Sequence, residues 1–157
     1  MMGRVRARFR VTRWAAVALM AAVALAGAPA AGASGRAPVV RVARVAGLGP
    51  VLVSGSGLTL YAYEPDHARR TTCLGYCARL WPPLLLPAGA RQPVGGAGVE
   101  RRLLGILRRP DGALQVTYAG WPLYRWQGDQ QPGQALGQAD EMGLWDAVGP
   151  AGHPVVG

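Results

Sequence analysis

The sequence predicts a mainly β fold in which two pseudo-equivalent antiparallel β repeats share one core, with short helical turns in the loops. A Leu-Tyr-x-aromatic-x-x-Asp unit occurs twice, at residues 60–66 and 123–129. The landmark Leu80-Trp81 recurs as Leu144-Trp145, so the two offsets are 63 (124 − 61) and 64 (145 − 81). A fixed offset held over separate landmarks indicates an internal duplication. Alternating apolar and polar residues, as at 114–118, are typical of half-buried strands.

The first 33 residues have the features of a signal peptide. Five arginines precede an apolar run at 14–26, and small residues follow it, so we expect cleavage after Ala33 or nearby. The run is shorter than the ~20 residues of a membrane-spanning helix, so we expect no stable span; an uncleaved anchor is the alternative. No Cys lies near the cleavage site, which predicts no lipid anchor there. The mature protein is therefore expected to be secreted, or periplasmic and at the cell envelope.

The mature chain of 124 residues (157 − 33) is long enough for one domain with a real core. The formal charge of +9 falls to about +4, because five of the 17 basic residues leave with the signal and 12 remain against 8 acids. That excess is too small to indicate a nucleic-acid partner. We expect a monomer with no cofactor.

Two cysteines, Cys73 and Cys77, stand four positions apart. In an exported chain this pair predicts a structural disulfide. A redox or metal/haem-associated role is the alternative. A redox dithiol is more typically C-x-x-C, haem attachment needs a His where Ala78 stands, and a zinc site has only His67 and His153 for further ligands.

The first half of the mature chain predicts three strands. Residues 34–38 form a linker, β-branched residues follow at 39–45, and this linker with the first strand occupies 34–47. Further strands are expected at 51–53 and 58–63 around a Ser-Gly turn. In the last, a period of two places Tyr61 and Tyr63 on one face and Leu60 with Ala62 on the other. Helical turns are expected within 67–80, and a Gly- and Pro-rich loop at 88–98.

The second half predicts a three-stranded meander. A short helix or irregular entry at 100–105 precedes a tight turn within 107–114, whose Pro110 and Gly112 suit the turn. Strands follow at 114–118 and 121–126, then a loop at 128–143 and a closing strand at 144–148. Units of this size are marginal alone, so one two-repeat β domain is expected at 48–152, with repeat one at 48–89 and repeat two at 103–152.

These spaced residues resemble the secreted repeat family of unknown function, often described as predicted lipoproteins with a Tyr-x-aromatic-x-x-Asp motif. The resemblance covers roughly residues 48–150. Its matching positions are 60–66; Cys73-x-Gly75-x-Cys77-Ala78-x-x-Trp81-Pro82-Pro83-Leu84; Leu103-Leu104-Gly105; Arg109-x-Asp111-Gly112-x-x-Gln115-Val116-Thr117-Tyr118-x-Gly120; Pro122-Leu123-Tyr124-x-Trp126-x-Gly128-Asp129; Pro132-Gly133; and Gly137-Gln138.

The resemblance implies an extracytoplasmic bacterial protein of tandem repeats, with no established activity. Two departures from the family pattern stand out. Relatives commonly carry an N-terminal lipid-bearing Cys, which is absent here. Relatives also often have a His at the position of Trp121, so a ligand role of that His would be lost in this chain.

The candidate ligand-binding residues are those that occur once per repeat: Tyr61, Asp66, Tyr124 and Asp129. In the functional interpretation, Tyr61 with Asp66 and Tyr124 with Asp129 form two symmetric polar sites, where phenol and carboxylate together suit a cation or a polar ligand. The structural interpretation, which we favour, is that each Tyr packs in an aromatic cluster and each Asp caps the loop after its strand.

The arginine pairs at 69–70, 101–102 and 108–109 could together attract an anionic surface, such as lipid headgroups or wall polymers. We favour their interpretation as solvated turn and edge-strand charges. Four tryptophans could offer a stacking platform, but we assign them to the core: Trp81, Trp121, Trp126 and Trp145.

No catalytic constellation and no metal site is recognisable. His67 follows Asp66, but no nucleophile is positioned by a motif, and a hydrolase is the weakest hypothesis. The sequence therefore favours an exported, non-enzymatic module that binds an unknown envelope component or small ligand. The alternative is a redox or metal/haem-associated extracytoplasmic protein that uses Cys73 and Cys77.

Overall fold

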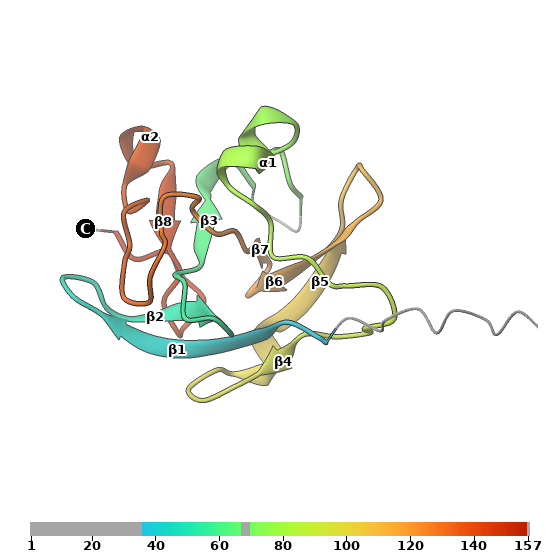
Figure 1. The fold of residues 1–157 in the computed structure, drawn as a ribbon, viewed down its shortest axis with the longest axis horizontal. Helices are drawn as coiled ribbons and strands as arrows, with labels where there is room; N and C mark the ends of the chain where they lie inside the picture. Colours follow the sequence, from blue (N-terminus) through green and yellow to red (C-terminus); the bar gives the residue numbers. More distant parts are fainter. Residues whose placement is uncertain (1–35, 67–69, 157) are drawn as a thin grey trace, which may run out of the picture. The chain divides into compact units, whose positions relative to one another are not determined.

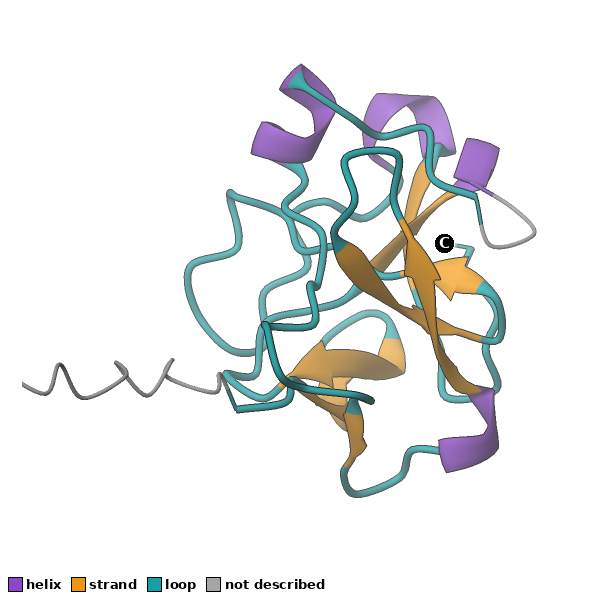
Figure 2. Cartoon of the chain, turned by 90° about the vertical axis from the view of Figure 1, so that its right-hand side faces the viewer, coloured by secondary structure: helices purple, strands orange, loops and turns teal. Residues whose placement is uncertain are grey.

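The computed structural model describes residues 36–66 and 70–156. The predicted signal peptide and His67 lie outside the described residues. Within them the fold is mainly β, as predicted, with short strands in three small sheets joined by long loops (Figures 1 and 2).

The first sheet has the strand order β2-β1-β4. Strands β1 (Val39–Val45) and β2 (Gly49–Ser54) form an antiparallel hairpin, which matches the predicted strands at 39–45 and 51–53. Strand β4 (Val94–Gly95) adds to the other edge of β1 in parallel. This strand lies inside the segment that the sequence predicts as a loop, because a run of Gly and small residues carries no strand pattern. The segment pairs because β1 offers a free edge.

The third sheet has the order β5-β6-β7 and forms the predicted meander, except that its last strand ends at Pro122 and not at Trp126. It consists of β5 (Leu104–Arg108), β6 (Leu114–Tyr118) and the short β7 (Trp121–Pro122). The predicted turn closes with a hydrogen bond from the Arg109 N–H to the Ala113 carbonyl, with Gly112 at φ 86°. Only Gly adopts such a positive φ without strain, which explains its place in this turn.

The two repeats are related by a pseudo-twofold axis between Tyr61 and Tyr124. The N–H of each donates to the carbonyl of the other, at 2.9 and 3.0 Å. The flanking bonds repeat in the same way: Leu84 N–H donates to Leu123 O at 2.9 Å, and Val148 N–H donates to Leu60 O at 3.0 Å. The second sheet lies in this seam and pairs β3 (Tyr61–Tyr63) with β8 (Trp145–Ala147). The sheet at the seam therefore takes one strand from each repeat.

The core consists of two clusters, and both repeats contribute to each. Leu60 and Ala62 belong to one cluster, while Tyr61 belongs to the other with Tyr63 packed against it. The period of two predicted for this strand is thus confirmed. Because both faces are buried, β3 shows no solvent side.

Short helical turns lie in the loops, as predicted. They are the 3-10 helices η1 (Glu64–Asp66) and η2 (Arg101–Leu103), and the α-helices α1 (Tyr76–Leu80) and α2 (Asp140–Gly143). Helices α1 and α2 lie at the top of the view in Figure 1, away from β1 and β4. No helix among the residues described is long and apolar enough to cross a membrane.

Candidate functional site

The four motif residues meet at the seam, and each tyrosine bonds the aspartate of the other repeat. The Tyr61 hydroxyl donates to Asp129 Oδ2 at 2.7 Å, and the Tyr124 hydroxyl donates to Asp66 Oδ2. Sequence reasoning paired each Tyr with the Asp five positions on in its own repeat. The structure instead exchanges the partners, because the pseudo-twofold axis runs between the two tyrosines.

The second carboxylate oxygen of each aspartate caps the loop of its own repeat. Asp66 Oδ1 accepts from the Thr72 N–H at 2.6 Å and from the Thr72 hydroxyl at 2.8 Å. Asp129 Oδ1 accepts from the Leu136 N–H at 2.9 Å. Both aspartates thus satisfy loop N–H groups, as the structural interpretation predicts, and also fasten the opposite tyrosine.

All four motif side chains are buried, with exposed fractions of 0 to 3%. Burial and the hydrogen-bonded Asp129 carboxylate raise the pKa of Tyr61. Burial and the Asp66 carboxylate likewise raise the pKa of Tyr124. Both phenols are therefore held in the neutral form, which donates a hydrogen bond to the carboxylate.

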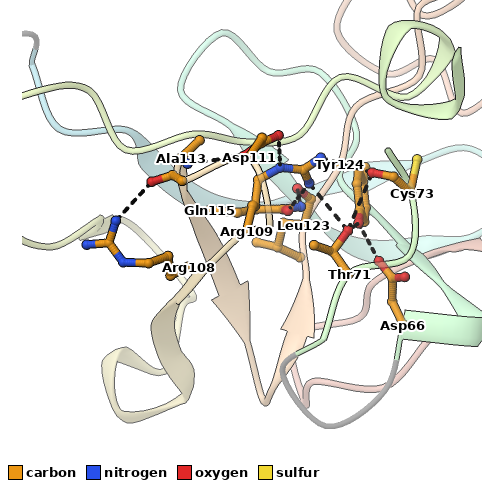
Figure 3. A network of polar contacts seen from close by, with 11 residues as sticks. Asp66, Thr71, Cys73, Arg108, Arg109, Asp111, Ala113, Gln115, Leu123 and Tyr124 are labelled. Atoms are coloured by element: carbon orange, nitrogen blue, oxygen red, sulfur yellow. Dashed lines mark hydrogen bonds and ion pairs between the residues drawn. The ribbon is translucent and has the colours of Figure 1, made fainter. Parts of the chain in front are cut away.

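The two pairs have different surroundings. Beside Tyr124, the Thr71 hydroxyl lies 2.6 Å from the phenol oxygen and 3.4 Å from Nη1 of Arg109 (Figure 3). Beside Tyr61, the Gly137 N–H donates to the phenol oxygen at 3.4 Å. The Tyr124 pair is thus linked through Thr71 to a buried cation.

Arg109 is 2% exposed, so the prediction of a solvated turn charge is wrong for this residue. Its guanidinium bonds Gln115 Oε1 at 2.5 Å, Cys73 O at 2.9 Å and the half-exposed Asp111 carboxylate at 3.1 Å (Figure 3). The hydrogen bond that Asp111 accepts from the Ala113 N–H, and then its bond to Arg109, lower the pKa of Asp111. A buried charge needs several partners, and the tertiary fold gathers these from two segments, at 111–115 and 71–73.

Four aromatic rings form a continuous stack across the seam. Trp81 and Trp145, equivalent residues of the two repeats, are parallel with centroids 3.8 Å apart. Tyr63 stacks on Trp145 and Trp126 packs on Trp81, each at 4.4 Å. Trp81 and Trp145 are buried, which confirms their assignment to the core, whereas Trp121 and Trp126 are half-buried.

Cys73 and Cys77 form the predicted disulfide at the entry to α1. Cys73 is buried and its carbonyl accepts from Arg109, whereas Cys77 is half-buried. The bridge therefore attaches α1 to the same buried network that holds Tyr124.

A family model described as "secreted repeat of unknown function" matches residues 43–85 and 105–149. The chain belongs to this family. No curated protein and no solved structure matches it. The two matched stretches are the two structural repeats, and each contains one Tyr and one Asp of the exchanged pairs. The description as secreted agrees with the export expected from the N-terminal residues.

The segment between the two family matches builds a recess beside β5. A pocket of about 460 Å³ is lined by Arg91, Gln92, Pro93, Val94, Gly95, Arg101, Leu104, Gly105 and Ile106. All but the last two lie outside the matched stretches. Arg91 and Arg101 are exposed and form no ion pair within the described residues.

Sequence reasoning missed this pocket. The pair at 101–102 was identified as charged, but its two members differ, since Arg102 bonds Glu100 at 2.6 Å while Arg101 lines the pocket. Arg91 stands alone in a loop of small residues and gave no signal. Of the residues described, no group of His, Cys, Asp and Glu is arranged to hold a metal ion.

Proposed function

We propose that this secreted repeat protein is a non-enzymatic binding module of the cell envelope. The observation that carries the proposal is the division between interior and surface. The polar side chains that occur once per repeat bond one another in the core, whereas the pocket beside β5 presents two exposed arginines that form no ion pair with any described residue. A rigid scaffold that carries its recognition groups on a connecting segment is a common arrangement for binding proteins.

The test is cosedimentation of the purified mature protein with cell-envelope fragments of the producing bacterium. We expect saturable binding that weakens as salt is raised, because exposed arginines act through screened charge. Arg91→Gln with Arg101→Gln removes the charges of the pocket. Arg79→Gln is the matched control, since Arg79 is exposed on α1, where it packs on Tyr76. Binding that is absent, or equal in both variants, would contradict the proposal.

A redox role of Cys73 and Cys77 is the second candidate, motivated by the unequal burial of the two residues. Half-buried Cys77 is the more accessible to an attacking thiolate. Equilibration with thiol buffers separates the candidates. A disulfide that stays oxidised in glutathione buffers at the redox potential of an oxidising compartment is structural. One that is reversibly reduced in those buffers supports the redox role.

A further inference from the structure

Strand β5 has a free edge. It lies at the end of its sheet, and the bonds from Ala119 N–H to Leu103 O and from Arg109 N–H to Ala113 O set its register against β6. Backbone groups alternate between the two edges of an antiparallel strand. Those of Leu104, Ile106 and Arg108 therefore point away from β6. The Leu104 N–H donates to the Arg101 carbonyl. Leu104 O and the Ile106 N–H have no backbone partner among the described residues.

The first repeat shows what fills this edge. Val40 and Val42 of β1 correspond to Leu104 and Ile106 by the common offset of 64, since Val42 pairs with Leu52 as Ile106 pairs with Val116. There the Gly96 N–H donates to Val40 O at 2.7 Å, and the Val42 N–H donates to Ala97 O at 2.9 Å. The connecting segment thus adds to β1 as a short parallel strand, and no described residue does so for β5.

The recess beside this edge has the chemistry for a chain that carries acid groups. The pocket is lined by apolar Leu104 and exposed Ile106 of β5, and by Val94 and Gly95 of β4. Arg91 and Arg101 stand on its rim without an ion pair among the described residues. A cationic rim around free backbone donors and acceptors complements an extended, anionic peptide.

We propose that β5 binds an extended acidic segment of another envelope polypeptide as an added parallel strand. The segment donates an N–H to Leu104 O, accepts from the Ile106 N–H, and places a carboxylate between Arg91 and Arg101. These bonds repeat those that residues 96 and 97 make with β1. The inference rests on the proposed function and names its ligand class.

The experiment uses the mature protein and a blocked synthetic peptide, acetyl-Thr-Val-Asp-Val-Asp-Val-Thr-amide, with its Asn-for-Asp analogue as the uncharged probe. Amide NMR and hydrogen exchange follow the Ile106 N–H during titration. We expect saturable binding, protection of this amide, and at least fivefold weaker binding of the Asn peptide. Arg91→Gln and Arg101→Gln should each weaken binding several-fold, and Arg79→Gln should not.

Ile106→Pro removes the outward N–H without breaking a bond to β6, and Ile106→Val is its control. We expect the proline variant to lose the peptide and the valine variant to keep it. The inference would be overturned if the Asn peptide bound as tightly as the Asp peptide, if Ile106→Pro bound the peptide as tightly as the unchanged protein, or if no peptide bound at all. So would dimerisation of the double Arg variant without peptide binding, because the arginines would then only guard the edge. Envelope cosedimentation that persists in Ile106→Pro would leave the proposed function standing and remove this inference alone.

Discussion

At the scale of single residues, the exchanged Tyr–Asp pairs join two roles in one carboxylate. One oxygen caps a local loop, and the other accepts from a tyrosine of the opposite repeat. The motif spans only seven residues in each repeat, yet the Tyr–Asp hydrogen bonds that it makes join residues far apart in the sequence. Removing either partner leaves a buried polar group unsatisfied, which costs about 1–3 kcal/mol.

We expect Asp66→Ala and Asp129→Ala each to lower the free energy of unfolding by at least about 2 kcal/mol. Each variant loses the hydrogen bond that caps the loop and leaves a buried phenol without its acceptor. Urea unfolding followed by tryptophan fluorescence measures this. The control is Glu64→Ala, an exposed acid whose side chain bonds no other described residue, and this variant should change stability little. Unchanged unfolding of the aspartate variants together with lost ligand binding would instead support a ligand site at the motif.

Alkaline pH should destabilise the fold through the same tyrosines. Their pKa values are raised in the folded state, so stability is fully present below the ordinary tyrosine pKa of ~10 and is lost as pH rises above it. In this range each phenol lowers the free energy of unfolding by up to about 1.4 kcal/mol per pH unit. Urea unfolding between pH 9 and 11.5 measures the slope. The double variant Tyr61→Phe and Tyr124→Phe should reduce it, and an equal slope would contradict this account.

At the scale of elements, the helical turns depend on the core to which they are fastened. Helix α1 has only five residues, far too few to form alone. Its position comes from the disulfide and from Trp81, whose N–H bonds Cys77 O at 2.8 Å as the helix ends.

The double variant Cys73→Ala and Cys77→Ala should lower the free energy of unfolding by about 2 kcal/mol, the chain-entropy value for so small a ring. Differential scanning calorimetry measures the loss. The three sheets should persist, because no strand contains either cysteine. A loss of β structure by circular dichroism would show that the disulfide is needed for the fold itself.

The aromatic stack depends on one glycine in the loop before α2. A Cβ at Gly137 would lie 2.5 Å from the Trp81 ring and 3.2 Å from Trp126 Cβ. Gly137→Ala therefore overpacks the seam, and we expect it to cost about 1–3 kcal/mol. Gly55→Ala, whose Cβ would meet Val39 at 3.4 Å, is the control. Near-ultraviolet circular dichroism and urea unfolding should separate the two variants; equal stability would show that the stack can shift.

At the scale of the whole molecule, neither repeat has a core of its own. Each cluster is built from both halves, and Trp81 stacks on Trp145 across the axis. We expect residues 34–98 and 99–157, expressed separately, to be unfolded, and the mature chain to unfold in one transition. Amide NMR dispersion tests the fragments. A folded fragment would mean that the repeats are independent units.

How far the sequence predicts the site differs among its residues. Asp66 and Asp129 were identified because a turn after a strand needs a cap, and that need is local. The functional interpretation placed each tyrosine beside the aspartate of its own repeat, since spacing along the chain does not locate a symmetry axis. The structure instead joins Tyr61 to Asp129 and Tyr124 to Asp66. Arg109 was taken for a surface charge, because an arginine beside a Pro-Asp-Gly turn has no sequence signal of burial.

The sequence by itself determined the β class, the duplication, the disulfide and the family, because strand periodicity, turn residues and repeated spacing are encoded within a few positions of one another. Only the tertiary structure decided which tyrosine meets which aspartate, that Arg109 is buried, and that β4 covers β1 while the edge of β5 stays free. Those features arise where segments distant in sequence compete for the same backbone edges and the same buried space. A single chain pattern cannot show which segment takes each place.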